Sequence, residues 1–186
     1  GSRRLGHPKQ AVRIDGVPLI RRIVRMVAEV CEGHVVVVLG ASSERVANCL
    51  QGMDFIRVDN RDWQSGLGSS LAQGVEALDG CCRAVLVTAC DLPCLSKEDL
   101  EMLATAWSRA PDRPAAARYE GVLGTPAILP ARVFPDLGRG RTGQLVGFTL
   151  DEVIEHEAVV EIALIAVGAD PGCRHARFAV PIGRRG

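Results

Sequence analysis

The sequence lacks an excess of charge of either sign. Its 22 Lys and Arg residues are matched by 22 Asp and Glu residues, so the formal net charge at pH 7 is zero. Nucleic acids and anionic membrane surfaces attract proteins through a surplus of positive charge. The composition therefore gives no reason to propose either partner.

Long hydrophobic runs are also missing. The longest apolar stretches fall far short of the roughly 20 residues that a membrane-spanning helix needs. The start of the sequence shows no signal-peptide pattern. We therefore expect a cytoplasmic protein that forms a single domain over residues 1–186, a length sufficient to bury a core without disulfides or structural metals.

The cysteines do not form paired Cys-x-x-Cys motifs of the zinc-ribbon type. There are seven of them, an odd number, scattered along the chain. We interpret them as reduced thiols, several of which fill the core. Cys90 and Cys94 flank Asp91, but two thiols without a neighbouring His are more often packing residues than metal ligands.

The stretch from Ala84 to Pro93 organises the rest of the chain. It begins as a run of Val, Leu and Ala without alternation, which is typical of a strand buried on both faces. Asp91 follows where the strand should end, and Pro93 prevents its continuation. Ligands of open α/β sheets bind at the carboxyl ends of strands, which makes Asp91 a candidate ligand for a metal or substrate. The alternative is a turn or helix-capping residue.

Strands and helices alternate before and after this stretch. We expect a helix over Pro18–Cys31, a strand over Val35–Leu39, a helix from Ser42 or Ser43 to Leu50, a strand over Phe55–Val58, a helix from Ser69 or Ser70 to Leu78, and a helix to Trp107 that begins with a capping box of Ser96 and Asp99. This order predicts βαβ units, a parallel sheet and helices on both of its faces.

Two loops have compositions suited to binding. Residues 1–10 are basic and rich in Gly, so they can bring amide and cationic groups to phosphates, although a solvated terminus has the same composition. Residues 59–70 contain Trp63, two glycines and the hydroxyls of Ser69 and Ser70, beyond the end of a strand. The alternative for the second loop is a serine N-cap after a glycine turn, with Trp63 packed on the core.

Five motifs, in order, resemble those of the MobA-like nucleotidyltransferases. Ser2, Arg4, Gly6 and Lys9 match the signature loop; Asp15-Gly16 and Pro18-Leu19 are similar to its G-x-P-L segment; Cys90-Asp91-Leu92-Pro93 is similar to its C-D-x-P metal motif. Asn60, Trp63, Gly66, Ser70 and Leu71 fit N-x-x-W-x-x-G-M-x-x-S-L, and Tyr119, Gly121, Gly124 and Pro126 fit Y-x-G-x-x-G-x-P. The last two motifs resemble the molybdenum cofactor cytidylyltransferase (MocA-like) branch.

The resemblance implies a Rossmann-like three-layer α/β/α nucleotidyltransferase fold with a mostly parallel sheet. In the family a strand and Leu-Ala-Ala-Gly precede the signature loop, whereas this sequence starts at Gly1, so we expect the first strand to be missing and its neighbours' edges to be exposed. The resemblance fades after Leu137, which leaves residues 138–186 as a divergent tail. A shifted reading frame in the gene is one hypothesis for that tail.

The resemblance also implies an activity, namely Mg²⁺-dependent transfer of CMP from CTP to the phosphate of molybdopterin. Lys9, Arg4 and Asp91 would be catalytic, with Lys9 and Arg4 on the triphosphate and Asp91 on Mg²⁺. The nucleotide would also contact Ser2, Gly6, Ser69 and Ser70, and the second substrate would contact Asn60, Trp63, Gly66, Tyr119, Gly124 and Pro126. Asp170 is the one tail carboxylate that could be a second metal ligand, and the alternative is a turn residue.

Two other functions stay open at this point. A chain without the first strand and with a divergent tail could be a non-catalytic accessory protein that binds the cofactor or a molybdenum enzyme. A sugar-nucleotide pyrophosphorylase would share the loop, the lysine and the aspartate. Such an enzyme would not be expected to carry the motif from Asn60 to Leu71.

Overall fold

A six-stranded sheet forms the centre of the computed structural model, which describes residues 9–32, 35–78, 82–119, 122–137, 162–169 and 177–178. The strand order is β5-β4-β9-β6-β8-β7. The strands are β4 (Val35–Leu39), β5 (Ile56–Asp59), β6 (Cys82–Ala89), β7 (Ala115–Tyr119), β8 (Val122–Pro130) and β9 (Ile162–Ala169). Two small pairs lie outside this sheet: β1 (Arg13–Ile14) with β2 (Val17–Pro18), and β3 (Cys31–Glu32) with β10 (Arg177–Phe178).

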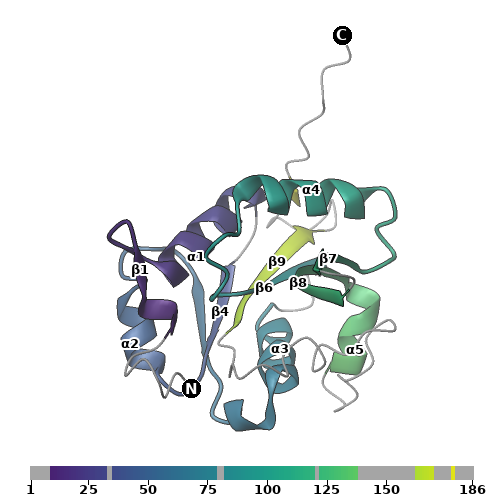
Figure 1. Cartoon of the computed structure of the whole chain (residues 1–186). Helices are drawn as coiled ribbons and strands as arrows, with labels where there is room; N and C mark the ends of the chain where they lie inside the picture. The colour runs from purple at the N-terminus through teal and green to yellow at the C-terminus, as the bar shows by residue number, and fades with distance from the viewer. Residues whose placement is uncertain are drawn as a thin grey trace.

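Helices cover both faces of the sheet (Figure 1). One layer contains α1 (Leu19–Val30), α2 (Ser43–Asn48) and α4 (Lys97–Ser108); the other contains α3 (Leu67–Glu76) and α5 (Phe134–Leu137). Three short 3-10 turns, η1 (Lys9–Ala11), η2 (Trp63–Ser65) and η3 (Ala131–Val133), complete the described elements. The predicted arrangement, with helices on both faces, is therefore present.

The side chains of β4 explain why this strand is apolar throughout. Val35, Val37 and Leu39 belong to the core beneath α1 and α4, whereas Val36 and Val38 belong to the core on the α3 side. Successive side chains of a strand point to opposite faces, so a strand between two helix layers needs an apolar residue at every position.

The sheet is mixed rather than mostly parallel. Strands β4 and β5 pair in parallel, but the other four pairings of the described sheet are antiparallel. It follows that β4, β5, β6 and β7 share one direction, while β8 and β9 run the opposite way. The prediction of a mostly parallel sheet is therefore correct only in that four strands share one direction. Most neighbouring strands are antiparallel, because β9 lies between β4 and β6, and β8 lies between β6 and β7.

Strand β9 occupies the central position of the sheet. It pairs with β4 through Val35, Val36 and Val37, and with β6 along nearly the whole length of that strand. Ile165 lies opposite both Val35 and Leu86. The prediction of exposed strand edges is wrong for β4 and β6, because β9, which comes from the segment interpreted as a divergent tail, pairs with both of them.

Three other elements match the predictions made from the sequence. The predicted strand Val35–Leu39 and the helix that starts at Ser96 match β4 and α4, and α1 lies within the predicted helix Pro18–Cys31. In the part of the chain that the structure describes, none of the helices combines the length and apolarity needed to cross a bilayer.

A proline at position 165 tests the central place of β9. Ile165→Pro removes an amide donor from a strand that is paired on both sides, and we expect it to lower the free energy of unfolding by about 3 kcal/mol or more. Urea denaturation followed by circular dichroism would measure the change. The control Ile165→Val keeps the amide and should cost only about 1 kcal/mol. Equal stabilities of the two variants would show that β9 is not in the sheet.

Candidate active site at the carboxyl edge of the sheet

Three strands end at one edge of the sheet, and the loops that contain Asn60 and Asp91 follow two of them. Strands β4, β5 and β6 share a direction, so their carboxyl ends lie on the same side. The backbone amide of Asn60, just after β5, donates a 2.8 Å hydrogen bond to the carbonyl oxygen of Leu39 at the end of β4. Asp91 lies two residues beyond the end of β6. The topology therefore places the loop of residues 60–70 and Asp91 at one edge.

Asn60 is the centre of the loop after β5. It is only 2% exposed. Its amide nitrogen donates to the hydroxyls of Ser69 and Ser70, at 2.9 Å each. Its amide oxygen accepts from the side chain of Gln73 and from the backbone of Asp62, both at 2.8 Å. These four bonds use both donors and both acceptor sites of the side chain, so Asn60 fixes the loop against α3.

The start of α3 differs from the prediction. The sequence predicts a helix that begins at Ser69 or Ser70, but α3 begins at Leu67 and its N-cap is Gly66, without a side-chain capping bond. The φ of Gly66 is 106°, a conformation that other residues rarely adopt, so glycine allows the chain to enter the helix two residues early. Both serines therefore belong to the helix, and their hydroxyls accept hydrogen bonds from the side chain of Asn60.

Trp63 packs against the end of β4. A Cβ atom at Gly40 would lie 3.1 Å from the Cβ of Trp63 and 3.2 Å from its Cγ. These distances are shorter than ordinary van der Waals contact, so a larger residue at position 40 would push the indole away. The side chain of Trp63 is half-buried and keeps part of its surface at this edge.

Asp91 has a different environment. Its side chain is half-buried, and within the described ranges the carboxylate has neither a hydrogen-bond nor an ion-pair partner. Carboxylates that structure a loop are usually hydrogen-bonded, so this one is available to a ligand. The described residues contain no cluster of three or more His, Cys, Asp or Glu side chains that could hold a metal ion. Mg²⁺ suits a single carboxylate, because it takes its other ligands from water and phosphates.

The loop that carries Asp91 is fixed by the start of α4. The Ser96 hydroxyl accepts from the amide of Asp99 at 3.2 Å, and the Asp99 carboxylate accepts from the amide of Ser96 at 2.9 Å and from its hydroxyl at 2.7 Å. This is the predicted capping box. The hydrogen bonds from the side chain and backbone of Ser96 lower the pKa of Asp99.

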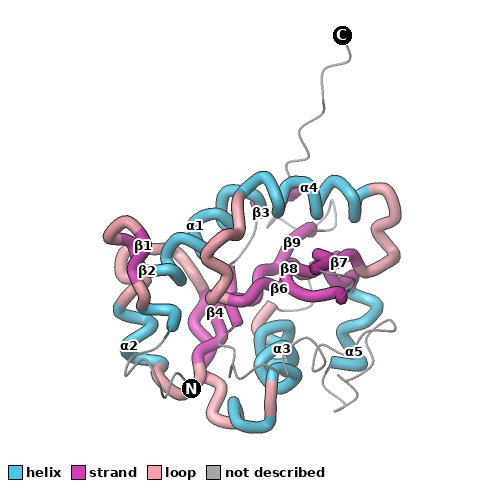
Figure 2. Tube along the Cα trace, in the orientation of Figure 1, coloured by secondary structure: helices cyan, strands magenta, loops and turns pink. Residues whose placement is uncertain are grey.

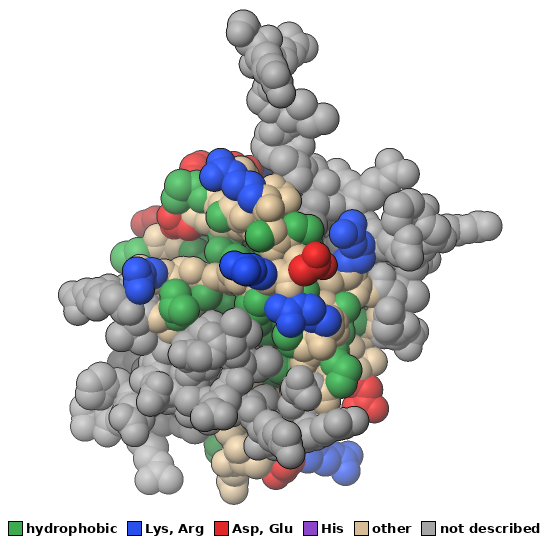
Figure 3. All heavy atoms as spheres, turned by 90° about the vertical axis from the view of Figure 1, so that its right-hand side faces the viewer, with side chains coloured by type: hydrophobic (Ala, Val, Ile, Leu, Met, Phe, Trp, Pro, Cys, Tyr) green, Lys and Arg blue, Asp and Glu red, His purple; other side chains and the backbone are tan. Residues whose placement is uncertain are grey.

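A hollow of about 470 Å³ opens beside the Asp91 loop, between α4 and the β7–β8 strands. Leu92, Leu95 and Leu103 make it largely apolar, and Arg118 and Pro126 also line it. Figure 3 views the molecule from the β7 side and shows hydrophobic side chains next to Lys and Arg. The predicted substrate residue Pro126 therefore shares a hollow with residues that follow Asp91.

The structure describes only some of the other predicted site residues. Gly124 is buried in β8 opposite Ala117, next to a register shift in the β7–β8 pair, and the Thr125–Pro126 peptide bond is cis. Lys9 begins η1 and Tyr119 ends β7, but their side chains are outside the description. Ser2, Arg4, Gly6 and Asp170 lie outside the described residues.

Residues 1–155 match the family model described as MobA-like NTP transferase domain. The chain belongs to this family. A nucleotidyltransferase domain implies a nucleoside triphosphate as substrate, which fits loops gathered at the carboxyl edge of the sheet. A search among curated proteins finds no match.

One solved structure confirms that the fold has precedent. The crystal structure of Rv0371c from Mycobacterium tuberculosis H37Rv superposes with a TM-score of 0.63, covering 84% of this chain and 79% of that one. The sequence identity is 17%, so the likeness concerns the fold alone.

Two residues that shape the site were not predicted from the sequence. Gln73 lies three and four positions after Ser70 and Ser69, so helical spacing places all three on one face of α3. That spacing was the available signal. Gly40 follows a buried strand like many turn glycines, and nothing in the sequence links it to Trp63.

Replacing Asn60 with Ala should destabilise the protein by about 2–4 kcal/mol, because the side chain of Gln73 and the amide of Asp62 lose a buried acceptor. Chemical denaturation would measure the loss. Asn48→Ala is the control, since Asn48 is exposed and accepts one long 3.5 Å hydrogen bond; we expect its effect to stay within about 0.5 kcal/mol. A similar small effect at Asn60 would contradict its central role.

The capping box predicts a pH dependence of stability. The folded-state pKa of Asp99 lies below its unfolded value, so its contribution is present above the unfolded pKa, about 4, and is lost as the pH falls through the lowered folded pKa. Asp99→Asn keeps an acceptor oxygen but does not titrate. Thermal unfolding between pH 6 and pH 2 should show a smaller loss in the variant than in the wild type. Parallel curves would contradict the prediction.

Proposed function

We propose that this chain transfers CMP from CTP to the terminal phosphate of molybdopterin and releases pyrophosphate. The family supports the reaction class, nucleotidyl transfer. The choice of CTP and molybdopterin rests on the likeness of Asn60, Trp63, Gly66, Ser70 and Leu71 to the MocA-like branch. These residues belong to one loop and helix start at the carboxyl edge of the sheet, which is where such a motif can act together.

The observation that carries the proposal is the free carboxylate of Asp91. It lies at the same edge as the motif loop and has no partner among the described side chains. A hard carboxylate oxygen that is half-buried and available suits Mg²⁺ in a complex with phosphates. When bound, Mg²⁺ would offset negative charge on the phosphate oxygens.

The reaction requires positioning more than covalent chemistry by the protein. An oxygen of the acceptor phosphate forms a bond to the α-phosphorus, while the bond between that phosphorus and the oxygen bridging to the β-phosphate breaks and pyrophosphate leaves. In the proposal, Lys9 and Arg4 hold the triphosphate with their positive charges. Ser2, Gly6, Ser69 and Ser70 would complete the nucleotide side, the hydroxyls of Ser69 and Ser70 being held by Asn60.

The acceptor would bind on the β8 side of Asp91. The apolar hollow beside Pro126 offers a surface for a flat heterocycle, and Arg118 offers a cation for its phosphate. Trp63, supported by Gly40, would border the acceptor from the opposite loop. Tyr119, Gly124 and Asn60 would shape the site, Asn60 as a positioning residue because its hydrogen bonds are already used.

Pyrophosphate release tests this proposal. We expect turnover with CTP, but little with GTP or ATP, in the presence of Mg²⁺ and molybdopterin, and loss of turnover with a chelator. Asp91→Asn removes the charge with little change in shape and should lower kcat/KM by about 100-fold. Asp112→Asn, at an exposed carboxylate away from the edge, should leave the rate unchanged.

Each result has a distinct meaning. Turnover with GTP or ATP instead of CTP would contradict the nucleotide assignment and leave the reaction class intact. Full activity of Asp91→Asn would contradict the metal assignment. Absence of pyrophosphate release from folded protein with all three nucleotides would favour the accessory function.

A further inference from the structure

Three of the described arginines line a hollow on the side of the molecule formed by the β1–β2 hairpin, the start of α1 and the end of α2. Figure 2 shows this hairpin beside both helices. The hollow has a volume of about 400 Å³, and Arg13, Arg21 and Arg25 contribute to its lining. It shares no lining residue with the loop of residues 60–70 or with the Asp91 loop. It is therefore separate from the two described loops of the candidate active site.

Two of these guanidinium groups are held by backbone oxygens. Arg21 donates to the carbonyl of Gln51 at 2.9 Å and to that of Cys49 at 3.3 Å, just beyond α2. Arg13 donates to the carbonyl of Gly16 at 2.6 Å within the hairpin. In each arginine these bonds use only the Nη1 atom, so the N–H donors of Nε and Nη2 remain for a ligand. Arg25 lies one turn after Arg21 on α1 and is exposed.

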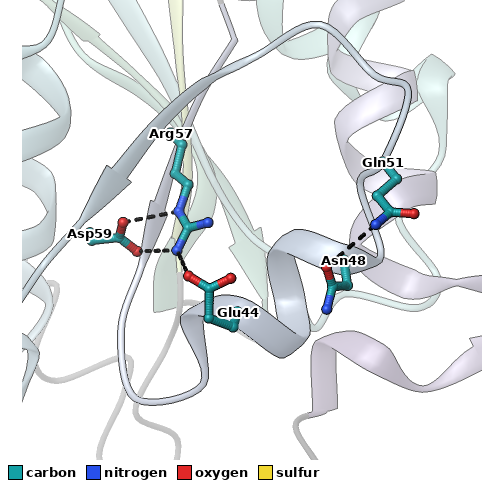
Figure 4. A network of polar contacts seen from close by, with 5 residues as sticks. All are labelled: Glu44, Asn48, Gln51, Arg57 and Asp59. Carbon is teal, nitrogen blue, oxygen red and sulfur yellow. Dashed lines mark hydrogen bonds and ion pairs between the residues drawn. The ribbon is translucent and has the colours of Figure 1, made fainter.

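Among the residues that the structure describes, no carboxylate lines the hollow and no acidic side chain forms an ion pair with these three arginines. The contrast with Arg57 is visible in Figure 4, where its guanidinium contacts both Glu44, at 2.5 Å, and Asp59, at 2.9 Å. The other described cation with acidic partners is Lys97, near Glu29 and Glu101. In a chain of zero net charge, the unpaired arginines of the hollow create a local positive field.

We propose that this hollow binds the di- or triphosphate group of a small ligand. Guanidinium forks match phosphate oxygens in pairs, and groups already fixed by backbone bonds lose little freedom on binding. The side chains of Asn48 and Gln51 at the rim add amide groups to the same surface. Three cations favour a multiply charged phosphate over a single carboxylate, and the volume admits a nucleotide as well as an inorganic polyphosphate.

Calorimetric titration of the whole chain with tripolyphosphate, without Mg²⁺, tests the proposal. Arg25→Gln removes a charge that no described hydrogen bond uses, so its fold should be unaffected, and binding at the hollow should weaken about ten-fold. Arg22→Gln is the matched control, because Arg22 is on the same helix but does not line the hollow. Raising the salt concentration should weaken binding further.

Lys9→Ala separates this hollow from the candidate active site. Binding that survives Lys9→Ala and weakens in Arg25→Gln would support the hollow, whatever the outcome for CMP transfer. Equal affinities of Arg25→Gln, Arg22→Gln and the wild type would overturn the proposal. Repeating the titration of the Lys9→Ala variant with CTP distinguishes the two ligand sources: a higher affinity than for tripolyphosphate would assign a nucleotide to the hollow, and an equal or lower affinity would assign the phosphate group alone.

Discussion

The backbone pairing of β9 with both β4 and β6 is the interaction on which the architecture depends. Without it the sheet would separate into a β5-β4 pair and a β6-β8-β7 group, and each helix layer would lose the continuous apolar surface beneath it. A central strand satisfies its own backbone groups and those of two neighbours at once. Because β9 runs against both neighbours, it leaves them parallel to one another, and their carboxyl ends reach one edge.

The shared edge gathers residues that can bind a ligand. Residues far apart in the sequence, such as Gly40, Asn60 and Asp91, follow three strands that end together. The loop between Asn60 and Ser70 is then held by hydrogen bonds to a buried amide, and the Asp91 loop is held by the capping box of α4. Two independent local devices thus fix two loops on one rigid sheet, which is the way in which precise sites are usually built.

The features that could be predicted from the sequence are those encoded by neighbouring residues. The run Val35–Leu39 and the pair Ser96 and Asp99 carry signals within a few residues, and both appear as expected. Serine is common at helix starts, which predicts a helix from Ser69 or Ser70, but with Gly66 as its N-cap α3 begins earlier, at Leu67, and Ser69 and Ser70 bind the buried Asn60 instead. The place of β9 depends on pairing with strands more than 70 residues earlier in the sequence, and no local pattern encodes such a partner.

Asn60 and Asp91 show how structural and functional polar groups differ at the same edge. Asn60 is buried and its hydrogen-bonding capacity is filled by its own chain, so removing it mainly disturbs the loop. Asp91 is half-buried and its carboxylate has no hydrogen-bond or ion-pair partner among the described side chains, so its charge is available to a bound cation. Both residues stand in motifs of the family resemblance, which implies contact with a ligand for each of them. The hydrogen-bond geometry separates them, because a side chain whose bonds are already made can position a substrate-binding loop but has little left with which to bind the substrate itself.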